Sequence, residues 1–152
     1  MELFFFKRVI VALSILLAVG HANVTLAHSA GGAIDAAGTN ANATDLAAVT
    51  CYDDGDGPAA YLFVQIQDQS APLQGLLMSI HIQKGLQMTT STDAVSGDAT
   101  ASPGATLNGG NGIYYISATK TAAGTRIFTV TYHCMTSGNA HTGTDIALYQ
   151  AQ

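Results

Sequence analysis

Beyond residue 27 the chain has four histidines, and these are the side chains best suited to holding a transition metal: His28, His81, His133 and His141. If the chain is cleaved after Ala27, His28 becomes the mature N-terminus, and a neutral α-amine together with its own imidazole can chelate copper. One further imidazole from a strand would complete a T-shaped site. Strand alternation directs His81 and His133 away from the core, so either could be that ligand. The alternative is a set of scattered surface histidines.

A second candidate centre is an acidic turn formed by Asp53, Asp54 and Asp56, which are interspersed with glycine. Because glycine lets the backbone fold tightly, several carboxylate oxygens can converge there on calcium. Asp98 or Asp145 could complete the shell. Asp-Gly pairs are also common turn formers, so an acidic turn without a cation is the alternative interpretation.

Four aromatic residues are predicted to point outward: Tyr61, Phe63, Tyr115 and Tyr149. Exposed aromatic rings can form a platform for a surface glycan or a protein partner. The alternative is that these rings only cover a sheet edge.

Catalysis by a nucleophile or by paired carboxylates finds little support in the sequence. There is no Gly-x-Ser-x-Gly motif, and none of the aspartates sits in an apolar stretch that would raise its pKa into an acid role. We therefore expect a protein that is not an enzyme.

The first residues have the pattern of a signal peptide, predicted for 1–27. Two basic residues precede an apolar run at 9–20, which is short for a membrane span, and small residues follow. Cleavage after Ala22, Ala27 or Ala30 fits the pattern, and Ala27 is preferred. The alternative is an uncleaved anchor. Cleavage predicts export to the periplasm or the extracellular space, with no membrane attachment afterwards.

The charges of the remaining chain restrict its partners. From residue 28 onward there are nine aspartates, no glutamate and three basic residues, so the formal charge is 3 − 9 = −6. Binding to nucleic acid requires clustered lysine and arginine, so we expect no nucleic-acid partner.

Two cysteines in an exported chain predict one disulfide, between Cys51 and Cys134. A pair of reactive or metal-binding thiols is the alternative, which no CxxC spacing supports.

Alternating apolar residues predict strands at 61–68 and 76–84, and a hairpin over Gly112–Cys134. With shorter segments around them, the pattern indicates an all-β fold: an antiparallel sandwich, jelly-roll or immunoglobulin-like, of about seven or eight strands. Residues 28–47, rich in alanine, glycine and asparagine, are predicted to be a flexible arm, and 48–152 the sandwich domain.

The segment Asn111-Gly-Ile-Tyr-Tyr-Ile-Ser, with Gly124-Thr-Arg-Ile-Phe-Thr-Val-Thr-Tyr after it, resembles the closing hairpin of bacterial pre-peptidase C-terminal domains. The resemblance implies a secreted β-sandwich, often stabilised by calcium, that is appended to proteases and other exported enzymes.

The leading hypothesis is a secreted, non-catalytic module that acts by binding or assembly at the cell surface or in the periplasm. Its partner would be a protein, a surface glycan or further copies of the chain. The alternative is a metal-binding protein, with calcium at the turn that begins at Asp53 or copper at His28.

Overall fold

A computed structural model describes residues 28–152. The signal peptide predicted for 1–27 lies outside the described residues. Nine strands make up the fold: β1 (His28–Ile34), β2 (Thr44–Tyr52), β3 (Tyr61–Asp68), β4 (Met78–Lys84), β5 (Gln87–Asp93), β6 (Ala105–Asn108), β7 (Gly112–Lys120), β8 (Arg126–Met135) and β9 (Gly143–Gln150). Within residues 28–152 there is no helix long and apolar enough to cross a membrane.

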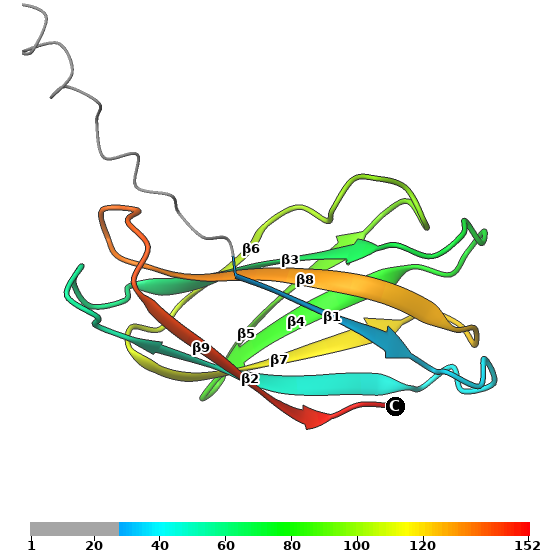
Figure 1. Ribbon diagram of the computed structural model, residues 1–152, viewed down its shortest axis with the longest axis horizontal. Helices are drawn as coiled ribbons and strands as arrows, with labels where there is room; N and C mark the ends of the chain where they lie inside the picture. The colour runs from blue at the N-terminus through cyan, green and yellow to red at the C-terminus, as the bar shows by residue number, and fades with distance from the viewer. Residues whose placement is uncertain (1–27) are drawn as a thin grey trace, which may run out of the picture.

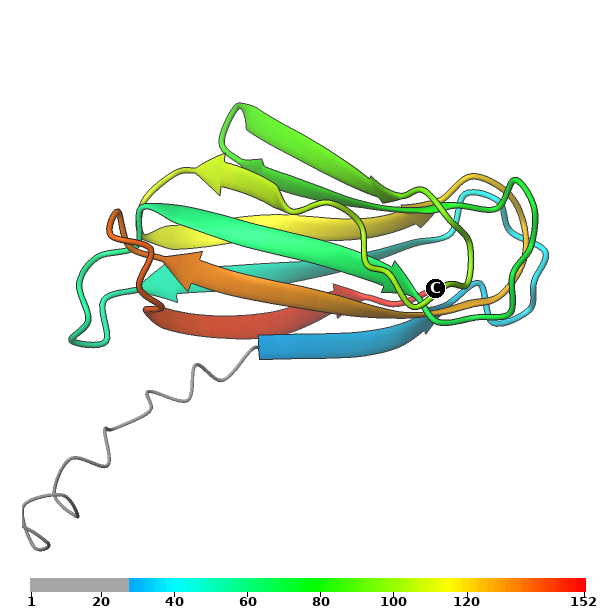
Figure 2. The ribbon, with the colours of Figure 1, turned by 90° about the horizontal axis from the view of Figure 1, so that it is seen from above.

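The strands form two antiparallel sheets that pack face to face (Figures 1 and 2). One sheet has the order β1-β8-β3-β6, and the other has the order β5-β4-β7-β2-β9. The predicted all-β sandwich is therefore confirmed, with nine strands in place of seven or eight. The strand that the sequence did not predict is β1, in which alanine and glycine replace larger alternating residues.

Alternation in the central strands supplies the core. In β3, Leu62, Val64 and Ile66 are completely buried, while the residues between them face outward. The inward side chains of the two sheets meet in one apolar cluster, as expected where each sheet has one buried face. On the facing sheet the largest contribution comes from Tyr114, also completely buried.

The disulfide predicted between Cys51 and Cys134 is present. Cys51 lies on β2 and Cys134 on β8, so the bond joins the two sheets through the core. Both residues are buried. The inward orientation of Cys134 follows from strand phase, because Cys134 continues the alternation that buries every second residue of β8.

The prediction of a flexible arm at 28–47 is wrong. Residues 28–34 form β1, which pairs with β8 along its whole length, and 44–47 open β2. No alternation is visible in this segment because small residues replace the β-branched ones that usually mark a strand. At Gly32 an added Cβ would lie 3.2 Å from the ring of Phe128, so glycine lets this backbone lie close to the core.

Asp35 anchors the end of β1. Its Oδ2 accepts a hydrogen bond from Lys120 Nζ at 2.7 Å, and both side chains are buried. Its carboxylate also accepts the backbone N–H groups of Thr39, Asn40 and Gly124. The Lys120 hydrogen bond is the main cause that holds the pKa of Asp35 well below its ordinary value, and the backbone donors add to it.

We expect the disulfide to contribute strongly to stability. It closes a loop with a sequence separation of 83 residues, for which loop-closure entropy gives about 4 kcal/mol. The double variant Cys51→Ala/Cys134→Ala should lose roughly that much free energy of unfolding, measured by urea titration with far-UV circular dichroism. A loss below about 1 kcal/mol would contradict the entropic estimate.

A second prediction concerns Asp35→Asn, which leaves the buried Lys120 without its counter-charge. The melting temperature at pH 7 should fall clearly below that of the wild type. Because folding lowers the pKa of Asp35, its contribution is present above the unfolded pKa of about 3.9 and is lost as the pH falls towards the folded pKa. The difference in melting temperature between the wild type and Asp35→Asn should therefore decrease as the pH falls from about 4 to 2.

The matched control is Asp56→Asn, because Asp56 is exposed on a turn. It removes the same charge without a buried partner and should leave the melting temperature nearly unchanged. A gap for Asp35→Asn that is the same at pH 2 and pH 7, or an equal loss in the control, would refute this assignment.

Candidate metal centre

Three histidines converge at the end of the sandwich where the described chain begins. His28 opens β1, His133 lies near the end of β8, and His141 lies between β8 and β9. One possible ligand atom from each lies within 4.8 Å of the other two, and all three residues are half-buried. Within residues 28–152, no other group of three or more histidine, cysteine or acidic side chains comes together in this way.

Strand register places the first two ligands. The antiparallel pairing of β1 with β8 sets His28 opposite Tyr132, the residue before His133. His133 is in turn paired with Phe63 on β3. His133 thus sits on a strand held by neighbours on both sides, which fixes its backbone more firmly than a loop would.

The third ligand is positioned by a closed loop. His141 makes an isolated β-bridge to Met135. The next residue, Thr142, donates its backbone N–H to the carbonyl of Cys134 at 3.0 Å. Its hydroxyl lies 2.7 Å from the carbonyl oxygen of Gly57, to which it can donate. Thr142 is only 1% exposed, so His141 is held by a buried neighbour.

The distances between the rings fit a shared ion. His133 Nδ1 and His141 Nε2 are 2.6 Å apart, with one nitrogen donating to the other. Two imidazole nitrogens bound side by side on a metal at about 2.0 Å would be about 2.8 Å apart. The His28 ring stacks on His141 with centroids 5.0 Å apart, and its Nδ1 is buried without a hydrogen-bond partner among residues 28–152. Since buried polar atoms are normally paired, this nitrogen is available to a ligand.

Burial and the neighbouring histidines favour the neutral form of two of the rings. Burial lowers the pKa of His133, and the neighbouring His141 and His28 lower it further. The pKa of His141 is lowered mainly by burial, then by His28, while Asp54 acts in the opposite direction. A neutral imidazole has the lone pair that a metal requires, so these two residues are prepared for coordination near neutral pH.

Aromatic rings lie beside two of the three histidines. Phe63 stacks on His133 with centroids 6.2 Å apart, and Tyr132 lies 5.9 Å from His28. Gly104 leaves the space that the Phe63 ring occupies, because a Cβ there would overlap that ring.

His81, predicted as an alternative third ligand, does not join the cluster. It lies on β4 in the other sheet. Its Nδ1 is 2.9 Å from Thr90 Oγ1, and its Nε2 is 2.9 Å from Thr119 Oγ1. Both ring nitrogens are thus engaged by threonine hydroxyls across the strands.

In the acidic turn, carboxylate oxygens accept hydrogen bonds from backbone N–H groups of the same turn. Asp53 Oδ1 accepts the N–H groups of Gly55 and Gly57. Asp54 Oδ1 lies 3.2 Å from the hydroxyl of Thr142. Within residues 28–152 the carboxylates of Asp53, Asp54 and Asp56 do not form a cluster suited to a cation. In this arrangement they shape a turn beside His141.

The four predicted surface aromatics lie in two separate places. Tyr61 and Phe63 lie on β3, and the Tyr61 hydroxyl donates to Asn139 Oδ1 at 2.7 Å, in the loop that leads to His141. Tyr115 and Tyr149 belong to the other sheet, where their exposed rings pack edge to face with centroids 6.3 Å apart. They do not form a single platform.

Sequence reasoning missed the role of His141. No strand pattern covers this residue, so its direction could not be inferred. The available signal was its distance from His133: eight positions along the chain, with a glycine-containing connection between them. If that connection reverses the chain, both histidines lie at the same end of the sandwich.

In comparisons with known proteins, no protein-family model, no curated protein and no solved structure matches the chain.

Proposed function

We propose that the exported form of this chain is a copper-binding protein whose ligands are His28, His133 and His141. The observation that carries the proposal is the convergence of three imidazoles within 4.8 Å of one another, with His28 Nδ1 buried and unpaired. The proposal includes cleavage after Ala27, which would make His28 the first residue.

Cleavage would add a fourth nitrogen. The α-amine of His28 and its own Nδ1 can close a six-membered chelate ring on one ion. This ring requires Nδ1, the atom that is left without a partner in the fold. With His133 and His141, the set becomes four nitrogens, which suits the tetragonal geometry that Cu(II) prefers.

The ligand types favour copper over other metals. The cluster contains neither a thiolate nor a carboxylate, and both cysteines are in the disulfide. Calcium and magnesium prefer oxygen ligands. Among the divalent metals that accept imidazole, copper is bound most tightly by a given nitrogen site.

Four nitrogens would occupy the strongest positions around Cu(II), so the site is better suited to holding the ion than to activating a substrate. The role that follows is a carrier or store for copper outside the cytoplasm. It is consistent with the non-catalytic binding module that the composition indicates. The acidic turn would support this centre by holding Thr142, next to His141.

Titration of the mature protein with Cu(II), followed by calorimetry and electron paramagnetic resonance, tests the proposal. We expect one ion per chain and a spectrum with nitrogen ligands. His133→Ala and His141→Ala should each weaken binding by more than the roughly 10–100-fold that follows loss of an outer-shell partner.

Two controls distinguish copper binding at this site from copper binding by any exposed histidine. His81→Ala should bind copper like the wild type, because both nitrogens of His81 are already engaged. A protein with one glycine added before His28 keeps every side chain but displaces the α-amine, so it should bind more weakly. Melting curves confirm that each variant is folded.

Three results would reject the proposal. Mass spectrometry of the exported protein could show a first residue other than His28. His81→Ala could weaken binding as much as His141→Ala. Competition could show that zinc is held more tightly than copper.

A further inference from the structure

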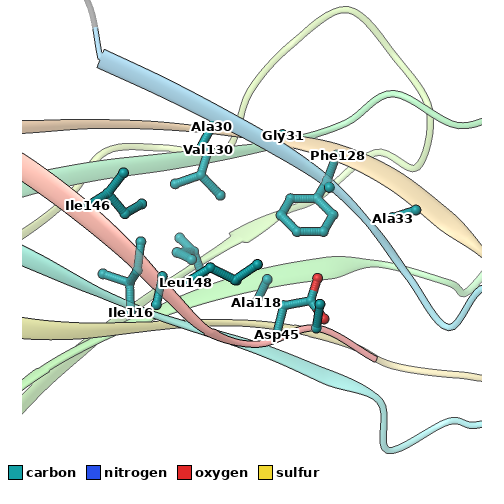
Figure 3. A pocket seen from close by; sticks show the side chains of 14 residues that line it. Ala30, Gly31, Ala33, Asp45, Ile116, Ala118, Phe128, Val130, Ile146 and Leu148 are labelled. Carbon is teal, nitrogen blue, oxygen red and sulfur yellow. The ribbon is translucent and has the colours of Figure 1, made fainter.

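A groove opens between the edge strands of the two sheets. β1 ends one sheet and β9 ends the other, and the two are not paired with each other. Figure 3 looks into the space between them. The groove has a volume of about 320 Å³, so a small molecule could enter between the sheets here.

Small side chains create this space. On the β1 side the lining is Ala30, Gly31, Gly32 and Ala33, and from the facing sheet Ala47 and Ala118 contribute. The walls beyond them are apolar, so water gains few hydrogen bonds inside. A cavity of about 150 Å³ with such walls stays dry and admits a molecule the size of benzene. This groove is about twice that volume, so it has room for a hydrocarbon chain of more than six carbon atoms.

Asp45 places one ionisable group in the apolar lining. The residue is only 8% exposed, and burial raises the pKa of its carboxyl group. Its Oδ1 accepts the backbone N–H of Gln152 at 2.8 Å. Its Oδ2 faces β1 across the groove, because a Cβ added at Gly32 would lie 3.6 Å from that oxygen.

In the described part of the chain, no basic side chain pairs with this carboxylate. Within residues 28–152 the ion pairs are Lys120 with Asp35 and Arg126 with Asp68, and neither includes Asp45. A buried charge is costly without an opposite charge nearby. A ligand with an ammonium group would supply that charge, while its apolar part fills the space lined by alanine and glycine.

We propose that this groove binds a small amphipathic amine, with its ammonium group on Asp45 and its hydrocarbon part between β1 and β9. The assignment rests on the groove, the single carboxylate in its lining and the lack of a basic partner. It does not depend on copper binding, because the three histidines are not part of the lining.

The test uses three probes with the same hydrocarbon chain: octylamine, octanol and octanoate. Binding to the mature protein is measured by calorimetry and by NMR shift mapping, with EDTA present so that the amine cannot bind through a metal. Octylamine should bind at the groove. Octanol should bind at least about tenfold more weakly, since its hydroxyl can donate to the carboxylate but brings no positive charge to it. Octanoate should not bind.

Two variants test the carboxylate and the apolar space of the groove separately. Asp45→Asn keeps an oxygen that accepts the N–H of Gln152, so the fold should persist. In this variant the affinity for octylamine should fall about tenfold or more, while the affinity for octanol should not change. Ala30→Leu fills the groove and should abolish the binding of octylamine and of octanol. Ser29→Leu, on the opposite side of the same strand, is the matched control and should leave octylamine binding unchanged.

Four outcomes would overturn the proposal: no binding of octylamine up to its solubility limit, equal affinity for octanol, an unchanged affinity in Asp45→Asn, or shifts that map outside the groove.

Discussion

Seven residue pairs hold β1 against β8, from His28 opposite Tyr132 to Ile34 opposite Arg126. Both candidate sites depend on this pairing. At its first pair it brings His28 beside His133, and along its length it forms one wall of the groove. Because β1 is an edge strand of small residues, it buries little apolar side-chain area. Backbone hydrogen bonds and the contacts at its two ends must therefore hold it in place.

The far end of β1 is held by charge. Asp35 follows the strand with a positive φ of 56°, and its carboxylate receives Lys120 together with three backbone donors. The Lys120 ammonium is saturated, because it also donates to the carbonyls of Asn40 and Ala122. This buried pair lies about 20 Å from His28, given the rise per residue of a strand. A loss of the pair would remove the anchor at the far end of the strand that carries the first histidine.

Sequence reasoning predicted the parts of the fold in which side chains alternate. The inward residues of β3 and β8, and with them the orientation of Cys134, follow from a period of two. β1 was missed because alanine and glycine carry no such signal. The ion pair of Asp35 and Lys120 could not be predicted either. The two residues are 85 positions apart, so their contact depends on tertiary structure alone. His133 was identified from its strand phase, whereas His141 required knowledge of a loop.

The cysteines, the acidic turn and the histidines, which the sequence presents as separate features, are connected in the fold. The carbonyl of Cys134 accepts the backbone N–H of Thr142, while the carbonyl of Tyr52, next to Cys51, lies 3.1 Å from the Thr142 hydroxyl. The backbone of Thr142 is therefore fixed at the Cys134 end of the disulfide. Its single hydroxyl hydrogen can be donated to one acceptor at a time among the carbonyls of Tyr52 and Gly57 and the carboxylate of Asp54. Since His141 directly precedes Thr142, the cross-link that joins the two sheets also limits how far this imidazole can move. A metal centre gains from such restraint, because ligands that are already in place lose less conformational entropy when the ion binds.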